Sequence, residues 1–127
     1  MKYLLDTHIL LWWLEDSKRL KSSVRKIIQD DKNELFISVI SGAEISIKNR
    51  IGKLPLKTTV KKIFEASSFA VLEFNINHLI IMDKEPLQPD HKDPFDWILI
   101  SQAKAEKLTL ITSDPKIWQY RIALIKA

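Results

Sequence analysis

Short runs of apolar residues recur along the chain, and longer segments with the apolar spacing of helices separate them. The runs with the length and composition of strands cover residues 3–5, 35–37, 70–72, 108–111 and 123–125. Strands that alternate with helices pack as a parallel sheet that carries helices on its faces. The pattern therefore predicts an α/β fold with a central parallel sheet.

Two expected helix starts carry capping patterns, in which a small polar residue is followed three positions later by an acid. One is Ser41-Gly42-Ala43-Glu44, and the other is Asp93-Pro94-Phe95-Asp96, with proline at the first helical position. The second pattern predicts a helix that continues to about Lys107. Apolar spacing predicts further helices around residues 9–14, 24–28, 60–64 and 78–82.

The chain has 127 residues, 46% of them hydrophobic, and no repeat or flexible linker divides it. We therefore expect a single domain over residues 1–127. The absence of cysteine excludes thiolate catalysis, zinc–cysteine sites and a disulfide framework. The longest apolar stretch, residues 9–14, is far shorter than the roughly 20 residues that span a bilayer, and Asp6 and His8 interrupt any secretory signal. We expect a cytoplasmic protein without a membrane segment.

Acids lie where the expected strands end or the expected helices begin. Asp6 follows the first apolar run, and Asp114 follows the fourth. Glu44 and Asp96 lie at the expected starts of two helices, with Asp93 close to Asp96. In a parallel sheet these positions share one edge, so carboxylates that are distant in sequence meet in one cleft.

Converging carboxylates repel one another unless protons or a cation neutralise them. A hard divalent cation is the simplest resolution, and oxygen ligands without a thiol suit Mg²⁺ or Mn²⁺ better than Zn²⁺. Water held by such an ion can be aimed at a phosphodiester. The formal net charge of +4 mildly favours a polyanionic partner.

Each acid also has a structural explanation. Glu44 and Asp96 can act as the third residues of capping boxes, and Asp93 and Asp114 as N-caps, since proline follows both. Asp6 has no such duty unless it starts the next helix. The joint arrangement, rather than any single acid, favours a functional site.

The acids lie within four longer motifs. These are Leu4-Leu5-Asp6-Thr7-His8, Ser38-Val39-Ile40-Ser41 leading to Glu44-Ile45, His91-Lys92-Asp93-Pro94-Phe95-Asp96, and Leu110-Ile111-Thr112-Ser113-Asp114. In order and spacing the motifs resemble the PIN-domain nucleases of the VapC toxin type, which belong to type II toxin–antitoxin systems. The resemblance covers about residues 2–120.

This resemblance implies a three-layer α/β/α sandwich, Mg²⁺- or Mn²⁺-dependent endoribonuclease activity on RNA, a homodimer and a cognate VapB-type antitoxin. Carried over by position, the metal-binding acids are Asp6, Glu44, Asp96 and Asp114. Asp93 is similar to an extra acid of one subgroup. Thr7 and Thr112 would support the acids by hydrogen bonds.

Two positions depart from similar proteins. Ala43 stands where an aromatic residue is common, and Trp97 where a basic residue is common. Loss of a cation weakens phosphate contacts, whereas an exposed tryptophan can stack on a base. Trp12 and Trp13 are expected in the core or a dimer interface, because one helix face cannot bury every apolar residue between 9 and 14.

Histidines and basic residues near the acids have two interpretations. His8 and His91 are expected to be structural rather than catalytic, as lone histidines beside caps usually are. The basic residues form either a phosphate-binding rim or a solvated surface, and they are Lys48, Arg50, Lys53 and Lys57.

Other functions remain open from the sequence alone. The same fold can serve a housekeeping RNA-processing nuclease or a catalytically silent PIN-like interaction module, although intact acids argue against the latter. An aspartyl-phosphate phosphatase needs a second aspartate two places after Asp6, where His8 stands. A receiver domain usually carries an acidic pair near the first strand, which Leu5-Asp6 does not provide.

Overall fold

A five-stranded sheet forms the centre of the computed structural model, which describes residues 1–86 and 88–127. The strands are β1 (Lys2–Leu5), β2 (Glu34–Ser38), β3 (Ala70–Leu72), β4 (Thr109–Thr112) and β5 (Leu124–Lys126). Neighbours pair in the order β3-β2-β1-β4-β5, and every pair is parallel. The predicted parallel sheet is confirmed, with β1 at its centre.

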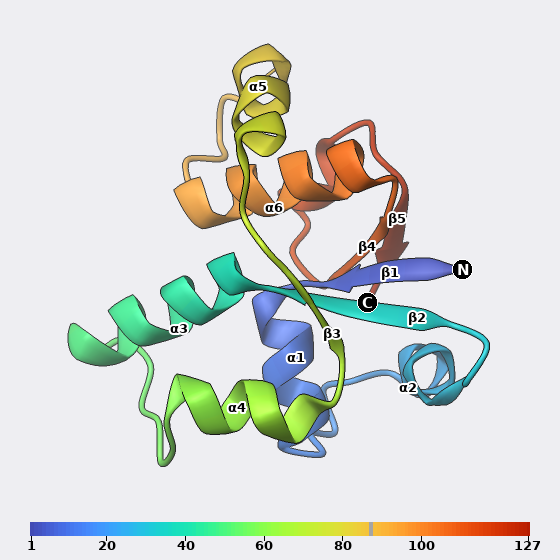
Figure 1. Cartoon of the computed structure of the whole chain (residues 1–127), viewed down its shortest axis with the longest axis vertical. Coiled ribbons are helices and arrows are strands. Elements are labelled where there is room, and N and C mark those ends of the chain that lie inside the picture. The colour runs from blue at the N-terminus through green and yellow to red at the C-terminus, as the bar shows by residue number, and fades with distance from the viewer. Residues whose placement is uncertain (87) are drawn as a thin grey trace.

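Helices cover both faces of this sheet (Figure 1). They are α1 (Thr7–Leu14), α2 (Ser22–Gln29), α3 (Val39–Arg50), α4 (Val60–Ser67), α5 (Ile76–Lys84) and α6 (Pro94–Glu106), followed by the 3₁₀ helix η1 (Ile117–Gln119). Helices α1, α2 and α4 lie on one side of the sheet, and α5 and α6 lie on the other. The three-layer α/β/α sandwich expected from the family resemblance is confirmed.

The side chains of the central strand alternate between the two faces of the sheet, and each face carries one apolar core. Tyr3 and Leu5 of β1 pack in a cluster with residues of α1, α2 and α4. Leu4, between them, packs on the opposite face with Leu99 and Ile100 of α6. Successive side chains of a strand point to opposite faces, so a short apolar run can supply both cores.

The start of α3 corrects one expectation. The capping residue is Ser38, whose hydroxyl accepts a hydrogen bond from the backbone N–H of Ile40, and the helix begins at Val39 rather than after Ser41. Gly42 therefore lies inside the helix, where an added Cβ would stand 3.1 Å from Cε1 of Phe64 in α4. Glu44 consequently belongs to the second turn and has no capping role.

The start of α6 agrees with the sequence in its first half. Asp93 caps the helix by accepting the N–H of Phe95, and Pro94 occupies the first turn. The Asp96 carboxylate contacts His91 instead of completing a capping box. The Asp96 carboxylate therefore does not cap the helix and is free to take part in a site.

The apolar segment at 9–14 packs inward more fully than its composition suggests. Trp12 and Trp13 are both half-buried, and both pack against the cluster formed with α1, α2 and α4. Among the described residues, no helix has the length and apolarity needed to cross a bilayer.

Candidate metal centre

The acids gather at the carboxyl edge of the sheet. Asp6 directly follows β1, and Asp114 follows the neighbouring strand β4. Glu44 comes from α3, which leaves the end of β2, and Asp96 lies in the first turn of α6. Because β1 pairs with both β2 and β4, the three strand ends meet at one edge.

Asp6 is held rigidly at the end of β1. It is 5% exposed and caps α1, its Oδ1 accepting the N–H of Thr7 at 2.7 Å. Its Oδ2 accepts the hydroxyl of Thr112 at 2.7 Å. Burial raises the pKa of the Asp6 carboxyl, and the charge of Glu44 adds to this rise.

Glu44 is 3% exposed and has a different partner on each oxygen. Oε1 accepts the hydroxyl of Thr7 at 2.7 Å, and the ammonium group of Lys48, one turn later, forms an ion pair with Oε2. The Thr7 hydroxyl also lies 2.9 Å from the hydroxyl of Ser41. Thr7 and Thr112 thus support the acids as expected.

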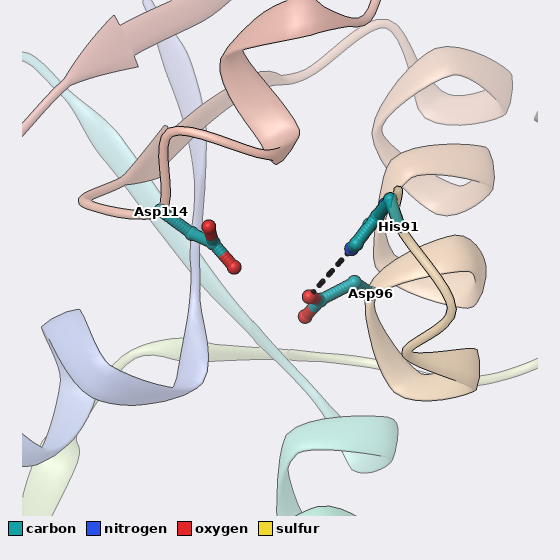
Figure 2. Close-up of side chains that lie close together, drawn as sticks. All are labelled: His91, Asp96 and Asp114. Carbon is teal, nitrogen blue, oxygen red and sulfur yellow. Dashed lines mark hydrogen bonds and ion pairs between the residues drawn. The ribbon is translucent and has the colours of Figure 1, made fainter. Parts of the chain in front are cut away.

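Asp96 lies opposite Asp114 across the site (Figure 2). Nε2 of His91 is 2.9 Å from Oδ2 of Asp96, and Nδ1 of His91 is 2.8 Å from the hydroxyl of Tyr120. One donor atom from each of His91, Asp96 and Asp114 falls within 4.8 Å of the other two. These three side chains are close enough to share one ion.

Electrostatic repulsion is strongest at Asp96. Burial, together with the charges of Asp6, Asp93, Glu44 and Asp114, raises the pKa of the Asp96 carboxyl to about 8. The other four predicted acids therefore all act on Asp96 across the cleft.

Lys48 lies in the same field. Burial disfavours its charge, but the hydrogen bond to Glu44 and the charges of Glu44, Asp93 and Asp96 outweigh that effect and raise the pKa of the ammonium group. Lys48 therefore stays charged and neutralises part of one side of the cleft.

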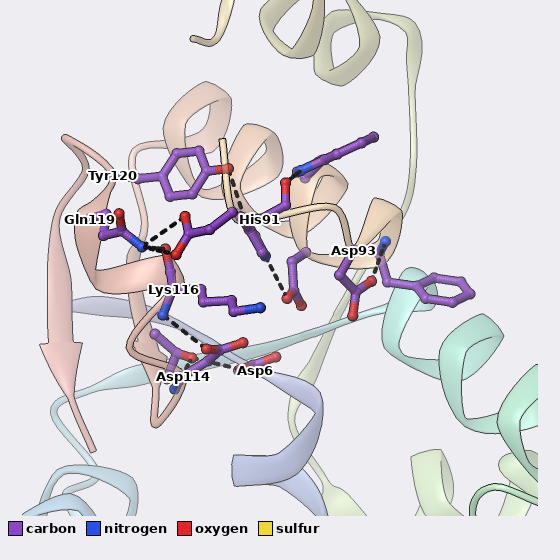
Figure 3. A network of polar contacts seen from close by, with 12 residues as sticks. Asp6, His91, Asp93, Asp114, Lys116, Gln119 and Tyr120 are labelled. Atoms are coloured by element: carbon purple, nitrogen blue, oxygen red, sulfur yellow. Dashed lines mark hydrogen bonds and ion pairs between the residues drawn. The ribbon is translucent and has the colours of Figure 1, made fainter. Parts of the chain in front are cut away.

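Asp93 and Asp114 combine site and backbone roles. Asp93 uses Oδ1 to cap α6, as its structural explanation predicts. Asp114 accepts the N–H of Lys116 at 2.9 Å, and its own N–H donates to the hydroxyl of Thr112 at 3.1 Å (Figure 3). Both side chains remain partly exposed, whereas Asp6, Glu44 and Asp96 are buried.

A model of the PIN domain family matches residues 3–123, which include every one of these acids. The chain belongs to the PIN domain family. The resemblance found in the sequence motifs is thus confirmed, and with it the nuclease class. No curated protein matches the sequence significantly.

Solved structures share the fold of this PIN domain at low identity. VapBC2 from Rickettsia felis, bound to a DNA fragment from its promoter, has a TM-score of 0.74 and 19% identity over 99% of this chain and 98% of that chain. VapBC-1 from nontypeable Haemophilus influenzae has a TM-score of 0.67 and 21% identity, with coverage of 99% and 98%. VapBC-5 from Mycobacterium tuberculosis, a member of the VapBC family of toxin–antitoxin systems, has a TM-score of 0.61 and 14% identity, again covering 99% and 98%.

Two residues of this PIN domain have surroundings that the sequence did not predict. His91 was assigned a structural role from the sequence, yet it contacts Asp96 and stands within reach of Asp114. The available signal was its place in the motif His91-Lys92-Asp93-Pro94-Phe95-Asp96, two residues before the Asp93 cap. Trp97 is not the exposed base platform considered above: it is half-buried, and its indole N–H donates to the carbonyl of His91 at 3.1 Å.

A hollow of about 300 Å³ opens beside the acids of the PIN domain. Its lining includes Glu44 together with His8, Lys48 and Lys53. A larger hollow of about 580 Å³ lies between α1 and α4, but its lining is mainly apolar and contains none of the site acids. Of these two hollows, the smaller one borders a site acid and carries lysine side chains.

Proposed function

We propose that this PIN domain is a Mg²⁺- or Mn²⁺-dependent endoribonuclease and the toxin of a toxin–antitoxin pair. The observation that carries the proposal is the convergence of carboxylates at one edge of the sheet, where burial and the charges of the other acids raise the pKa of Asp96 to about 8. Carboxylates arranged so that they destabilise one another are expected where a cation completes the site.

The donor set fits a hard divalent ion. The residues that would hold it are Asp6, Glu44, Asp96 and Asp114, with Asp93 adding negative charge nearby. Carboxylate oxygens are the ligands that Mg²⁺ and Mn²⁺ prefer. A bound ion of this kind supplies an activated water and a positive charge for the phosphoryl oxygens of the scissile bond.

The chain's own residues set the geometry of such a reaction. Thr112 fixes one oxygen of Asp6, and Thr7 fixes one oxygen of Glu44, so neither carboxylate must be ordered when substrate arrives. Lys48 and Lys53 border the hollow next to Glu44 and can pair with a phosphate of the bound strand. RNA rather than DNA as the substrate follows from the resemblance to VapC-type nucleases.

The antitoxin partner is proposed on similar grounds. The related solved structures are VapBC or FitAB-type complexes, which favours a toxin over a housekeeping nuclease. A basic side chain of a VapB-type antitoxin would find complementary charge at the acids. A short open reading frame next to this one, whose product binds the chain, would support the toxin assignment, while its absence would leave the nuclease proposal standing.

A homodimer also stays a proposal. The half-buried Trp12 and Trp13 give it less support than their sequence suggested. Exposed apolar side chains lie instead on α5, where Ile76 is 66% and Ile80 46% exposed. Sedimentation equilibrium at tens of micromolar tests the dimer, and a monomer at that concentration contradicts it.

The decisive experiment is RNA cleavage with controlled metal. Chelation should silence cleavage, Mg²⁺ or Mn²⁺ should restore it, and Asp6→Asn should abolish it with the fold retained. Asp31→Asn, at an exposed acid outside the site, is the matched control and should cleave normally. Full activity in excess chelator, or in Asp6→Asn, contradicts the proposal.

A further inference from the structure

His91 is buried, and both nitrogens of its ring have partners. The side chain is 2% exposed, with Nε2 at 2.9 Å from Oδ2 of Asp96 and Nδ1 at 2.8 Å from the Tyr120 hydroxyl. The imidazole also packs edge-on against the Tyr120 ring, with centroids 5.4 Å apart and an interplanar angle of 74°. Tyr120, His91 and Asp96 form a continuous chain of contacts that ends among the acids, and Figure 3 shows its Tyr120–His91 part and Figure 2 its His91–Asp96 part.

The partners determine which nitrogen carries the proton. When Asp96 is ionised, as a bound cation would require, its carboxylate only accepts hydrogen bonds, and Nε2–H of His91 donates to it. Nδ1 of the neutral ring is then an acceptor, and the Tyr120 hydroxyl can donate to it. In this tautomer His91 presents an N–H to Asp96, and Tyr120 satisfies the other ring nitrogen.

The backbone of His91 is anchored as well. Its N–H donates to the carbonyl of Gln88 at 3.1 Å, and its carbonyl accepts the indole N–H of Trp97 at 3.1 Å. Trp97 belongs to α6, the same helix that carries Asp96. The backbone of His91 is therefore fixed relative to Asp96, because both are attached to α6.

We propose that His91 is a positioning residue for Asp96 and that Tyr120 holds the imidazole in place. The imidazole holds Oδ2 of Asp96, while in the described part of the chain no side chain or backbone group hydrogen-bonds to Oδ1. Oδ1 would thereby stay free for a bound ion. This inference rests on the proposed function, because it assigns His91 a role at the same metal site.

Direct coordination by His91 is the competing arrangement. Nε2 is near enough to Asp96 and Asp114 to share an ion with them. Coordination requires a free lone pair on Nε2, which the ring has when Nδ1–H donates to the Tyr120 hydroxyl. In the proposed arrangement Nε2–H is directed at Asp96 instead. Carboxylate ligands are commonly oriented by such outer hydrogen bonds, whose loss costs about 10- to 100-fold in metal affinity.

Mn²⁺ affinity measured by titration calorimetry tests the proposal without relying on turnover. His91→Leu should lower the affinity by about 10- to 100-fold, since it removes the donor but keeps an apolar side chain. His91→Gln should restore most of the affinity, because its amide can place an N–H near the position of Nε2. Tyr120→Phe should give a smaller loss. His78→Gln, at the other histidine that contacts a carboxylate, is the matched control and should bind Mn²⁺ normally.

Three results would overturn the positioning role. The first is wild-type affinity in a folded His91→Leu protein. The second is a Mn²⁺ affinity of His91→Gln no higher than that of His91→Leu. If the leucine variant does not fold, Mn²⁺ affinities of His91→Gln and Tyr120→Phe that are both far below wild type overturn the role instead. The third is a strong ¹⁴N coupling in pulsed electron paramagnetic resonance of the Mn²⁺-loaded protein, which would identify the imidazole as a ligand.

Asp96→Asn, measured in parallel, separates this inference from the proposed function. Loss of Mn²⁺ binding in Asp96→Asn with normal binding in His91→Leu overturns only the role of His91. Normal binding in Asp96→Asn overturns the metal site itself, and the positioning role with it.

Discussion

Two buried histidines of this PIN domain make nearly the same contact in different surroundings. His78 of α5 is fully buried, and its Nε2 lies 2.9 Å from Oε2 of Glu106. His91 is equally buried, and its Nε2 lies 2.9 Å from Oδ2 of Asp96. A backbone N–H, that of Asn75, reaches Nδ1 of His78, whereas the Tyr120 hydroxyl reaches Nδ1 of His91.

The two carboxylates differ far more than the two imidazoles. The side chain of Glu106 is 39% exposed, so water solvates its charge. The side chain of Asp96 is 8% exposed and feels the charges of the other site acids. A histidine–carboxylate contact is therefore no functional signal by itself. The burial of the carboxylate and the charges around it distinguish the His78–Glu106 contact, which joins α5 to α6, from the His91–Asp96 contact at the cluster of acids.

The largest expected effect comes from neutralising each carboxylate in turn. Asp96→Asn should lower RNA cleavage by more than the about 100-fold that outer hydrogen-bond partners can cost, because in the proposed site it removes a direct ligand. Glu106→Gln should leave cleavage within about twofold of wild type, since its charge is solvated and far from the acids. Initial rates at saturating Mg²⁺ measure both. Equal losses of cleavage rate in Asp96→Asn and Glu106→Gln would contradict the view that only the His91–Asp96 contact belongs to a functional site.

The second prediction concerns pH and metal. The pKa of Asp96 is raised to about 8 in the folded protein from an ordinary value of 3.8, so between these pH values the folded state binds the extra proton. Stability of the metal-free protein should therefore fall as pH rises from about 4 to about 8 and level off above. The raised pKa of Asp6 acts in the same direction.

Urea denaturation at pH 5.5 and 8.5 in chelator measures this slope. Saturating Mg²⁺ should flatten it by stabilising the ionised site, by about 2.7 kcal/mol at a free concentration of 100 times Kd. Asp96→Asn should flatten it without metal, whereas Glu106→Gln should not. A wild-type slope that persists unchanged in Asp96→Asn would show that the charge cluster does not control stability.

Much of the fold was predictable because local alternation decides it. Each predicted strand run overlaps an observed strand, since apolar runs of that length can satisfy both faces of a covered sheet. The first residue of α3 could not be predicted, because Ser38 and Ser41 are both plausible N-caps. The choice depends on where β2 ends, and pairing of Ser38 with Leu72 in β3 extends the strand to Ser38.

The sequence could predict the part of the candidate site that consists of acids at strand ends. Parallel topology brings Asp6 and Asp114 to one edge whatever the details of packing. The role of His91 was not predictable, because its Nδ1 partner, Tyr120, lies 29 residues away in sequence and meets it only through the path of the chain around α6. A contact of that kind leaves no local pattern.

A smaller effect, on stability rather than function, is expected at His78. His78→Leu removes the contact to Glu106 and the acceptor for the Asn75 N–H, and so weakens the cap of α5. We expect a loss of about 2 kcal/mol in the free energy of unfolding, from one capping interaction and one buried hydrogen bond. Chemical denaturation measures it, and Asn77→Ala, on the exposed side of α5, is the control. Cleavage and Mn²⁺ affinity should not change, and a drop in either would mean that the α5–α6 contact reaches the site.

The smallest expected effect comes from Trp97, whose side chain hydrogen-bonds to the backbone of His91 and to none of the acids. Trp97→Phe keeps a ring in the half-buried position and removes the indole N–H that donates to the His91 carbonyl. The loss of one such bond should cost about 1 kcal/mol in the free energy of unfolding. Because Tyr120 still holds Nδ1, the imidazole should move only slightly and Mn²⁺ affinity should fall a few-fold, less than in His91→Leu. Trp13→Phe, at a half-buried tryptophan that packs near Phe69, controls for loss of indole area and should leave the affinity unchanged. An affinity loss in Trp97→Phe as large as that of His91→Leu would show that the loop anchor, rather than the Tyr120–His91–Asp96 chain, positions the carboxylate.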